Sequence, residues 1–90
     1  MKQYHIIVGG HVQGVGFRYF THAAALELGI KGWVRNTEDG SVEIVAEGKE
    51  NSLEAFLAKV QAGPRFSSVS EVNWNEKQAD VSYSSFTIKN

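Results

Sequence analysis

The stretch from Gly10 to Arg18 carries the residue types that anion binding requires. It reads Gly-His-Val-Gln-Gly-Val-Gly-Phe-Arg and joins an apolar, strand-like run to an amphipathic, helix-like run. Gly14 and Gly16 have no side chains to restrict the backbone, so successive N–H groups can turn inward as an anion-binding nest. The start of the following helix adds the positive end of its dipole. Arg18 adds a planar, permanently charged guanidinium, so the stretch predicts a site for a phosphate or a carboxylate.

This turn has other interpretations. Glycine turns often connect a strand to a helix without binding anything, and a solvated Arg18 is the matching alternative. The turn is not a Walker loop, because no Gly-Lys-Ser/Thr follows it, and it lacks the third glycine of a dinucleotide fingerprint. An arginine in the first turn of a helix opposes the helix dipole, which favours a use for Arg18 beyond helix stability.

Asn36 is the second candidate, at the end of an expected strand and just before a turn over residues 37–41. An asparagine there often bonds to its own backbone, so a turn-forming role competes with a chemical one. Glu38 and Asp39 are adjacent on the turn, and we expect them to be turn residues rather than catalytic carboxylates. Asp39 followed by Gly40 is the hairpin signal.

The remaining candidates have ordinary structural explanations. The histidines, which show no metal-ligand spacing, are His5, His11 and His22. His22 follows Arg18 by four residues and can share its helix face. We expect Trp33 in the core. Arg65 and Phe66 lie in a loop after a proline and suit a substrate entrance, but packing is the interpretation we expect.

Size and composition restrict the function classes. Ninety residues are enough for one domain, spanning residues 1–90. The absence of cysteine excludes disulfides, thiolate catalysis and cysteine metal sites. A formal net charge of −1 provides no global field to attract nucleic acid or an anionic membrane. We see no signal peptide and no apolar stretch of membrane-spanning length, so we expect a cytoplasmic protein.

Apolar periodicity predicts the elements that must position these residues. Strands are expected over 4–12, 30–36, 42–47, 68–75 and 85–89, and helices over 18–28 and from 51 or 52 to 62. Gly29 suits the C-terminal end of the first helix. Asn51 and Glu54 have the spacing of a capping box at the start of the second. Residues 76–80 are expected to form a loop. The order predicts an α+β sandwich of split-βαβ type, with one antiparallel sheet and two helices on one face.

Two stretches of the chain resemble the signature sequences of the acylphosphatase family. The first is Gly10-x-Val12-Gln13-Gly14-Val15-Gly16-Phe17-Arg18. The second is Gly32-Trp33-Val34-x-Asn36-x-x-x-Gly40-x-Val42, with Gly48 closing the block. Residue types and spacing both agree, and the resemblance covers nearly the whole chain in length and element order.

The resemblance implies a ferredoxin-like sandwich that hydrolyses the carboxyl–phosphate bond of acyl phosphates to a carboxylate and inorganic phosphate. Arg18 matches the family's phosphate-binding arginine, and Asn36 matches the asparagine that orients the attacking water. The phosphate cradle is matched by the backbone of Gln13, Gly14, Val15, Gly16, Phe17 and Arg18. We expect no metal and no cofactor. We also expect a monomer that acts on a small-molecule acyl phosphate, without nucleic acid or membrane partners.

Two other functions remain open. A regulatory anion-binding module would use the cradle but would not need Asn36. RNA binding is the third, because related sandwiches stack bases on sheet-face aromatics and the stretch 16–20 faintly resembles such a motif. That stretch lies at a helix start, however, and the net charge is slightly acidic. Turnover of a simple acyl phosphate separates the first two functions, and a salt-titrated RNA-binding assay tests the third.

Overall fold

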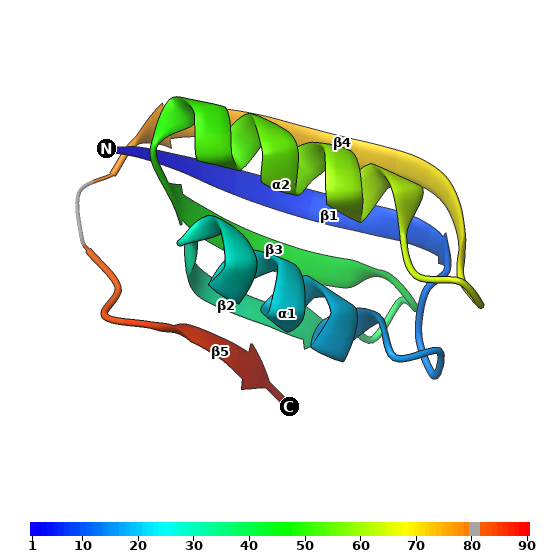
Figure 1. Ribbon diagram of the computed structural model, residues 1–90. Coiled ribbons are helices and arrows are strands. Elements are labelled where there is room, and N and C mark those ends of the chain that lie inside the picture. Colours follow the sequence, from blue (N-terminus) through cyan, green and yellow to red (C-terminus); the bar gives the residue numbers. More distant parts are fainter. Residues whose placement is uncertain (80–81) are drawn as a thin grey trace.

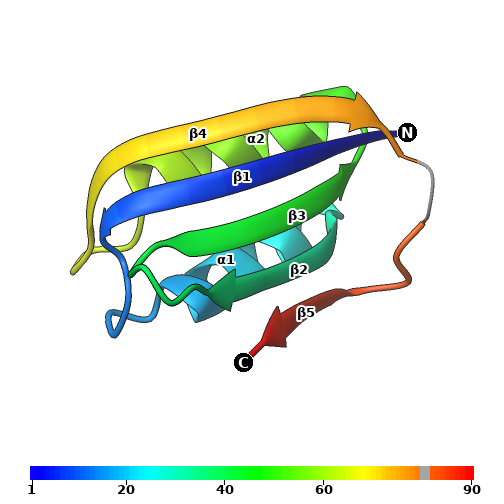
Figure 2. The ribbon, with the colours of Figure 1, turned by 180° about the vertical axis from the view of Figure 1, so that it is seen from behind.

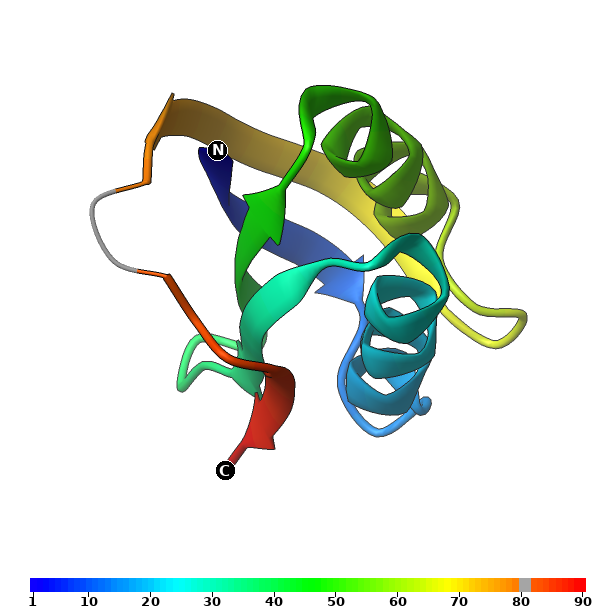
Figure 3. The same cartoon turned by 60° about the vertical axis from the view of Figure 1, so that its left-hand side comes forward.

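The computed structural model, which describes residues 1–79 and 82–90, contains a five-stranded sheet with two helices on one of its faces (Figure 1). In chain order the elements are β1 (Lys2–His11), α1 (Phe17–Leu28), β2 (Lys31–Asn36), β3 (Val42–Gly48), α2 (Glu50–Ala62), β4 (Ser68–Gln78) and β5 (Phe86–Lys89). Figure 2 shows the sheet from behind, with both helices on its far side. Figure 3 shows the same two layers closer to edge-on.

The sheet has the strand order β4-β1-β3-β2-β5, and the ferredoxin-like α+β fold class is confirmed. β1 pairs antiparallel with β3 and β4, and β2 pairs antiparallel with β3. β5 instead pairs parallel with β2, so the sheet is mixed rather than wholly antiparallel. The reason is the path of the chain: β5 begins at the end of the sheet where β4 stops, and it therefore runs in the direction of β2 (Figure 1).

The core lies between the helices and the sheet face that they cover. The alternation in β1 is confirmed, because Tyr4, Ile6 and Val8 are all buried. The apolar stripe of α2 is also confirmed, and its buried residues are Leu53, Phe56, Leu57 and Val60. The buried residues of α1 are Phe17, Thr21, Ala24 and Ala25. Both helices thus pack on the sheet mainly through apolar side chains, and this packing includes Phe17 at the start of α1.

Trp33 is not in the core, contrary to the sequence prediction. It alternates on β2 with the buried Val34, so its ring lies on the sheet face opposite the helices. There Arg35 and Lys89 place their cationic groups 5.8 Å and 4.5 Å from the ring centroid, and the indole N–H donates to the Tyr83 hydroxyl at 3.3 Å. The half-buried indole is therefore covered by polar and charged side chains.

Two predicted element boundaries are also wrong. α2 has Lys49 as its N-cap, and Asn51 lies inside the helix, where its side chain accepts a hydrogen bond from Ser52 N–H at 2.9 Å. The capping box with Glu54 therefore does not form. β4 continues to Gln78, since β1 begins at Lys2 and offers ladder partners that far. Charged residues are common on such an edge strand. Asp80, in the expected loop, lies outside the described residues.

Candidate functional site

A small cavity lies where the chain leaves β1 and enters α1. Its volume is about 90 Å³, and it is lined by Val12, Gly14, Gly16, Phe17, Arg18, Tyr19 and Asn36. The structure thus brings Arg18 and Asn36 to one cavity, although they come from different elements. A water molecule needs roughly 10–15 Å³ of cavity volume. The space therefore suits a phosphate and one water better than a bulky organic group.

Two glycines shape the backbone around this cavity. Gly14 has φ 74° and Gly16 has φ 80°, in the left-handed region where a side chain is strained. Gly16 is the N-cap of α1, and its carbonyl accepts the first helical bond from Phe20 N–H at 3.0 Å. The N–H groups of residues 17–19 precede that bond, so no helical carbonyl is available to them. Among the described residues, no side chain caps this helix end.

Phe17 and Val12 hold the cradle to the core. Each is only 1% exposed. The Phe17 ring lies 5.9 Å from that of Phe20, between centroids, beneath the start of the helix. A buried Phe17 cannot stack on a nucleotide base, so the stretch that faintly resembled an RNA-binding motif does not present its first aromatic side chain to a ligand.

Arg18 is half-buried on the face of α1 that meets β5. Its Nη1 donates to the Lys89 carbonyl at 3.4 Å. His22, four residues on, lies against Phe86 with ring centroids 6.1 Å apart, which confirms the shared helix face. Within the described part of the chain, Arg18 belongs to no ion pair. Its guanidinium is thus a cation without a carboxylate partner there, at the edge of an anion-sized cavity.

Asn36 is the last residue of β2, opposite Val42 of β3. The turn that follows is closed by Thr37 N–H donating to Ser41 O at 2.9 Å. The Asp39 carboxylate accepts from the Ser41 N–H at 3.1 Å and from the Ser41 hydroxyl at 2.6 Å, and the Thr37 hydroxyl also donates to it. These bonds, with the Ser41 hydroxyl first, lower the pKa of Asp39 to about 2. Asp39 is therefore a turn residue, as predicted.

Two residues expected in the cradle do not line the cavity. Val15 is half-buried and packs against the core. The carboxamide of Gln13 is bound to the turn after Asn36, where its Nε2 donates to the carbonyls of Thr37 and Ser41, both at 2.8 Å. The side chain of Gln13 thus connects the cradle loop to the turn after Asn36. Sequence reasoning considered only its backbone.

Asn36 also borders a wider, polar hollow of about 550 Å³, whose other lining residues are Arg35, Thr37, Glu38 and Asn90. Arg35 is bound to Glu43, with Nη2 and Oε1 2.6 Å apart. His5 Nε2 lies 2.7 Å from the other oxygen of Glu43, and this bond, ahead of that from Arg35, lowers the pKa of the carboxyl group. Asn36 thus borders both the small cavity and this polar hollow.

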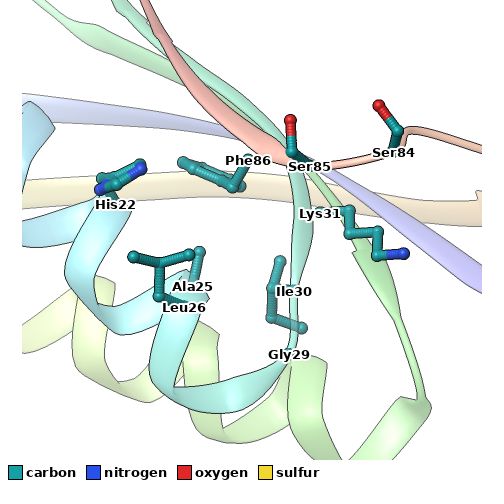
Figure 4. A pocket seen from close by; sticks show the side chains of 9 residues that line it. All are labelled: His22, Ala25, Leu26, Gly29, Ile30, Lys31, Ser84, Ser85 and Phe86. Carbon is teal, nitrogen blue, oxygen red and sulfur yellow. The ribbon is translucent and has the colours of Figure 1, made fainter.

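A third cavity, of about 450 Å³, lies between α1 and β5 and does not include Arg18 or Asn36 (Figure 4). Its apolar lining comes from the side chains of Ala25, Leu26, Ile30 and Phe86, and those of His22 and Lys31 lie towards opposite ends of the view. Nothing in the sequence pattern predicts it. It lacks the combination of helix N-terminus, guanidinium and amide that the smaller cavity has.

Three further observations bear on the sequence predictions. Among residues 1–79 and 82–90, no group of three or more His, Asp or Glu side chains is placed to hold a metal ion. None of the helices in these residues is long and apolar enough to cross a membrane. Phe66 is 74% exposed, with the Arg65 guanidinium 5.6 Å from its ring centroid, so the packing prediction for Phe66 is wrong.

Comparison with known proteins gives matches along the full length of the chain. The family model described as Acylphosphatase matches residues 4–88. The acylphosphatase of Bacillus subtilis (strain 168) is 47% identical over 88 residues, which cover 98% of this chain and 97% of the relative. That of Bacillus licheniformis is 50% identical over 88 residues, or 98% of each chain. The crystal structure of acylphosphatase from Bacillus subtilis matches with a TM-score of 0.97 and 46% identity, over 100% of both chains.

Proposed function

This chain belongs to the acylphosphatase family, and we propose that it cleaves the carboxyl–phosphate bond of small-molecule acyl phosphates in the cavity lined by Arg18 and Asn36. A water attacks phosphorus in line with the bond to the carboxyl oxygen. The P–O bond breaks, the carboxylate leaves with the bonding electron pair, and inorganic phosphate remains in the cradle. Phosphoryl transfer of this kind depends on positioning and on charge stabilisation.

Arg18 and the cradle hold the phosphate. The N–H groups of residues 17–19 and the positive end of α1 face the equatorial oxygens, where the transition state spreads its charge. The Arg18 fork donates two parallel hydrogen bonds to the same group. Arg18 gives up its contact with the Lys89 carbonyl when it binds phosphate. At 3.4 Å that contact is weak, so its loss costs little free energy.

Asn36 holds the attacking water. Its carboxamide can accept from that water and donate to it, which fixes the line of attack. The polar hollow that Asn36 also borders supplies the water. A neutral amide is a poor base, so an oxygen of the substrate phosphate takes the proton. The carboxylate is a good leaving group and needs no acid to protonate it.

One observation carries this proposal: an anion-sized cavity is lined by the uncapped N-terminus of a helix, an arginine outside any ion pair of the described residues, and an amide. The test is hydrolysis of benzoyl phosphate by the purified protein in excess EDTA, with phenyl phosphate as the monoester control. We expect turnover of the acyl phosphate alone. Equal rates on both substrates, or none on either, would contradict the proposal.

A further inference from the structure

Resting on the proposed function, we propose that Gln13 is a positioning residue whose carboxamide sets the distance between the two halves of the active site. The phosphate is held by the loop from β1 to α1, whereas the water is held at the end of β2. The two parts are remote in sequence. Their relative placement must still be accurate, because a misplacement of about 1 Å can cost on the order of 10²-fold in rate.

The contacts of Gln13 connect these parts directly. Its Nε2 carries two hydrogens, and they go to the carbonyls of Thr37 and Ser41, each at 2.8 Å. Thr37 directly follows Asn36, and the carbonyl of Ser41 also accepts the Thr37 N–H that closes the turn. Both ends of the turn are therefore fastened by one side chain from the cradle loop. Figures 1 and 2 both show this loop and this turn side by side at the same end of the sheet.

The anchoring of Gln13 makes the connection rigid. The preceding residue, Val12, is 1% exposed and belongs to the core, and Gln13 itself is half-buried. A carboxamide with both N–H groups on carbonyl oxygens has a single favourable orientation. Its side chain does not line the phosphate cavity. Gln13 therefore acts through Asn36 rather than on the substrate.

The test compares kcat with the inhibition constant of inorganic phosphate. Gln13→Met keeps the length of the side chain but cannot donate, and we expect kcat to fall on the order of 10–10²-fold with phosphate inhibition unchanged. Gln13→Lys, whose ammonium can donate to both carbonyls, should recover part of the rate. Ile30→Val, a buried change just before β2 and at the opposite end of that strand from Asn36, controls for a general loss of stability.

A double-mutant cycle separates positioning from other roles. If Gln13 acts through Asn36, then Gln13→Met should change kcat less than about twofold in the Asn36→Ala background. An equal loss in both backgrounds, an unchanged kcat for Gln13→Met, or weaker phosphate inhibition together with lower kcat would overturn the inference. A wild-type rate for Asn36→Ala alone would instead contradict the proposed function.

A measurement on the wild-type protein tests whether the connection forms, independently of turnover and of how the variants fold. The Gln13 side-chain NH₂ protons should exchange with solvent more slowly than those of Gln61, which is exposed on α2. Exchange of both amides at the same rate would mean that the connection does not exist in solution.

Discussion

Arg18 occupies a position that is unfavourable for a helix on its own. It lies in the first turn of α1, where the dipole repels a cation, and no carboxylate of the described residues is bound to it. A bound phosphate removes that conflict, because its charge complements both the arginine and the helix end. The arginine is thus explained by its ligand rather than by the fold.

Replacing Arg18 should therefore damage binding and catalysis together. We expect Arg18→Gln to lower kcat by about 10²–10³-fold and to weaken inhibition by inorganic phosphate, because one group serves both the ground and the transition state. Arg18→Lys should recover little, since a point charge cannot form the two parallel bonds. Arg65→Gln, on the exposed loop after α2, is the matched control. Near-normal kinetics for Arg18→Gln would place the site elsewhere.

At the scale of elements, the left-handed conformation of Gly16, the N-cap of α1, shapes the cradle. Gly16 and Gly29 cap the two ends of this helix with similar φ values of 80° and 70°, and a Cβ at either would meet open space. We expect Gly16→Ala and Gly29→Ala each to lower the free energy of unfolding by roughly 1–2 kcal/mol. Only Gly16→Ala should also weaken phosphate inhibition. Chemical denaturation and inhibition kinetics on both variants would show whether that difference exists.

The turn after Asn36 should loosen in acid. Hydrogen bonds from Ser41 and Thr37 lower the pKa of Asp39 to about 2, below its ordinary value. A lowered folded-state pKa means that these bonds stabilise the turn above the unfolded-state pKa and are lost as pH falls towards 2. NMR titration should show the Ser41 amide shifting over that acid range, and Asp39→Asn should abolish the shift. An Asp39 carboxyl that titrates near pH 4 would contradict this account.

The elements were predictable where one short-range pattern decides them. Alternation in β1 and the 3.6-residue stripe of α2 both reflect burial against a single face, and both are confirmed. The parallel pairing of β5 with β2 and the position of Trp33 outside the core depend on which strands become neighbours, and no local pattern encodes that. α2 begins at Glu50, earlier than predicted, because Lys49 adopts the extended N-cap conformation that we expected at Asn51.

The sequence also predicts part of the site. Arg18 and Asn36 could be selected by residue type and by resemblance, and the structure brings both to one cavity. The role of the Gln13 side chain is not predictable from the sequence, because its partners are backbone carbonyls of residues 37 and 41. Backbone acceptors carry no sequence signal, so contacts of this kind become visible only once the turn and the loop are placed together.

At the scale of the whole molecule, the described residues offer the reaction an arginine, an amide and backbone N–H groups, and no cluster of metal ligands. These groups suffice to stabilise charge and to orient water. We therefore expect kcat on benzoyl phosphate to be unchanged after exhaustive EDTA treatment. Loss of activity that a divalent cation restores would contradict this expectation.

The volume of the cavity limits which part of the substrate the protein contacts. About 90 Å³ accommodates the phosphate and its water, so the acyl group lies outside the cradle. We expect kcat/KM for acetyl phosphate and benzoyl phosphate to agree within about 200-fold, because one apolar contact changes specificity by about 1–3 kcal/mol at most. A difference of several orders of magnitude would require an acyl-binding subsite.

The central claim is that Arg18 holds the phosphate whereas Asn36 orients the attacking water. Kinetics of Asn36 variants test this claim most directly. Asn36→Ala should abolish most of kcat while the inhibition constant of inorganic phosphate stays close to that of the wild type. Asn36→Asp should also be inactive near neutral pH, because it places a negative charge beside an anionic substrate. Asn73→Asp, on the exposed edge strand β4, is the control. An Asn36→Asp enzyme as active as the wild type, or increasingly active as pH rises, would mean that this position abstracts a proton rather than orients water.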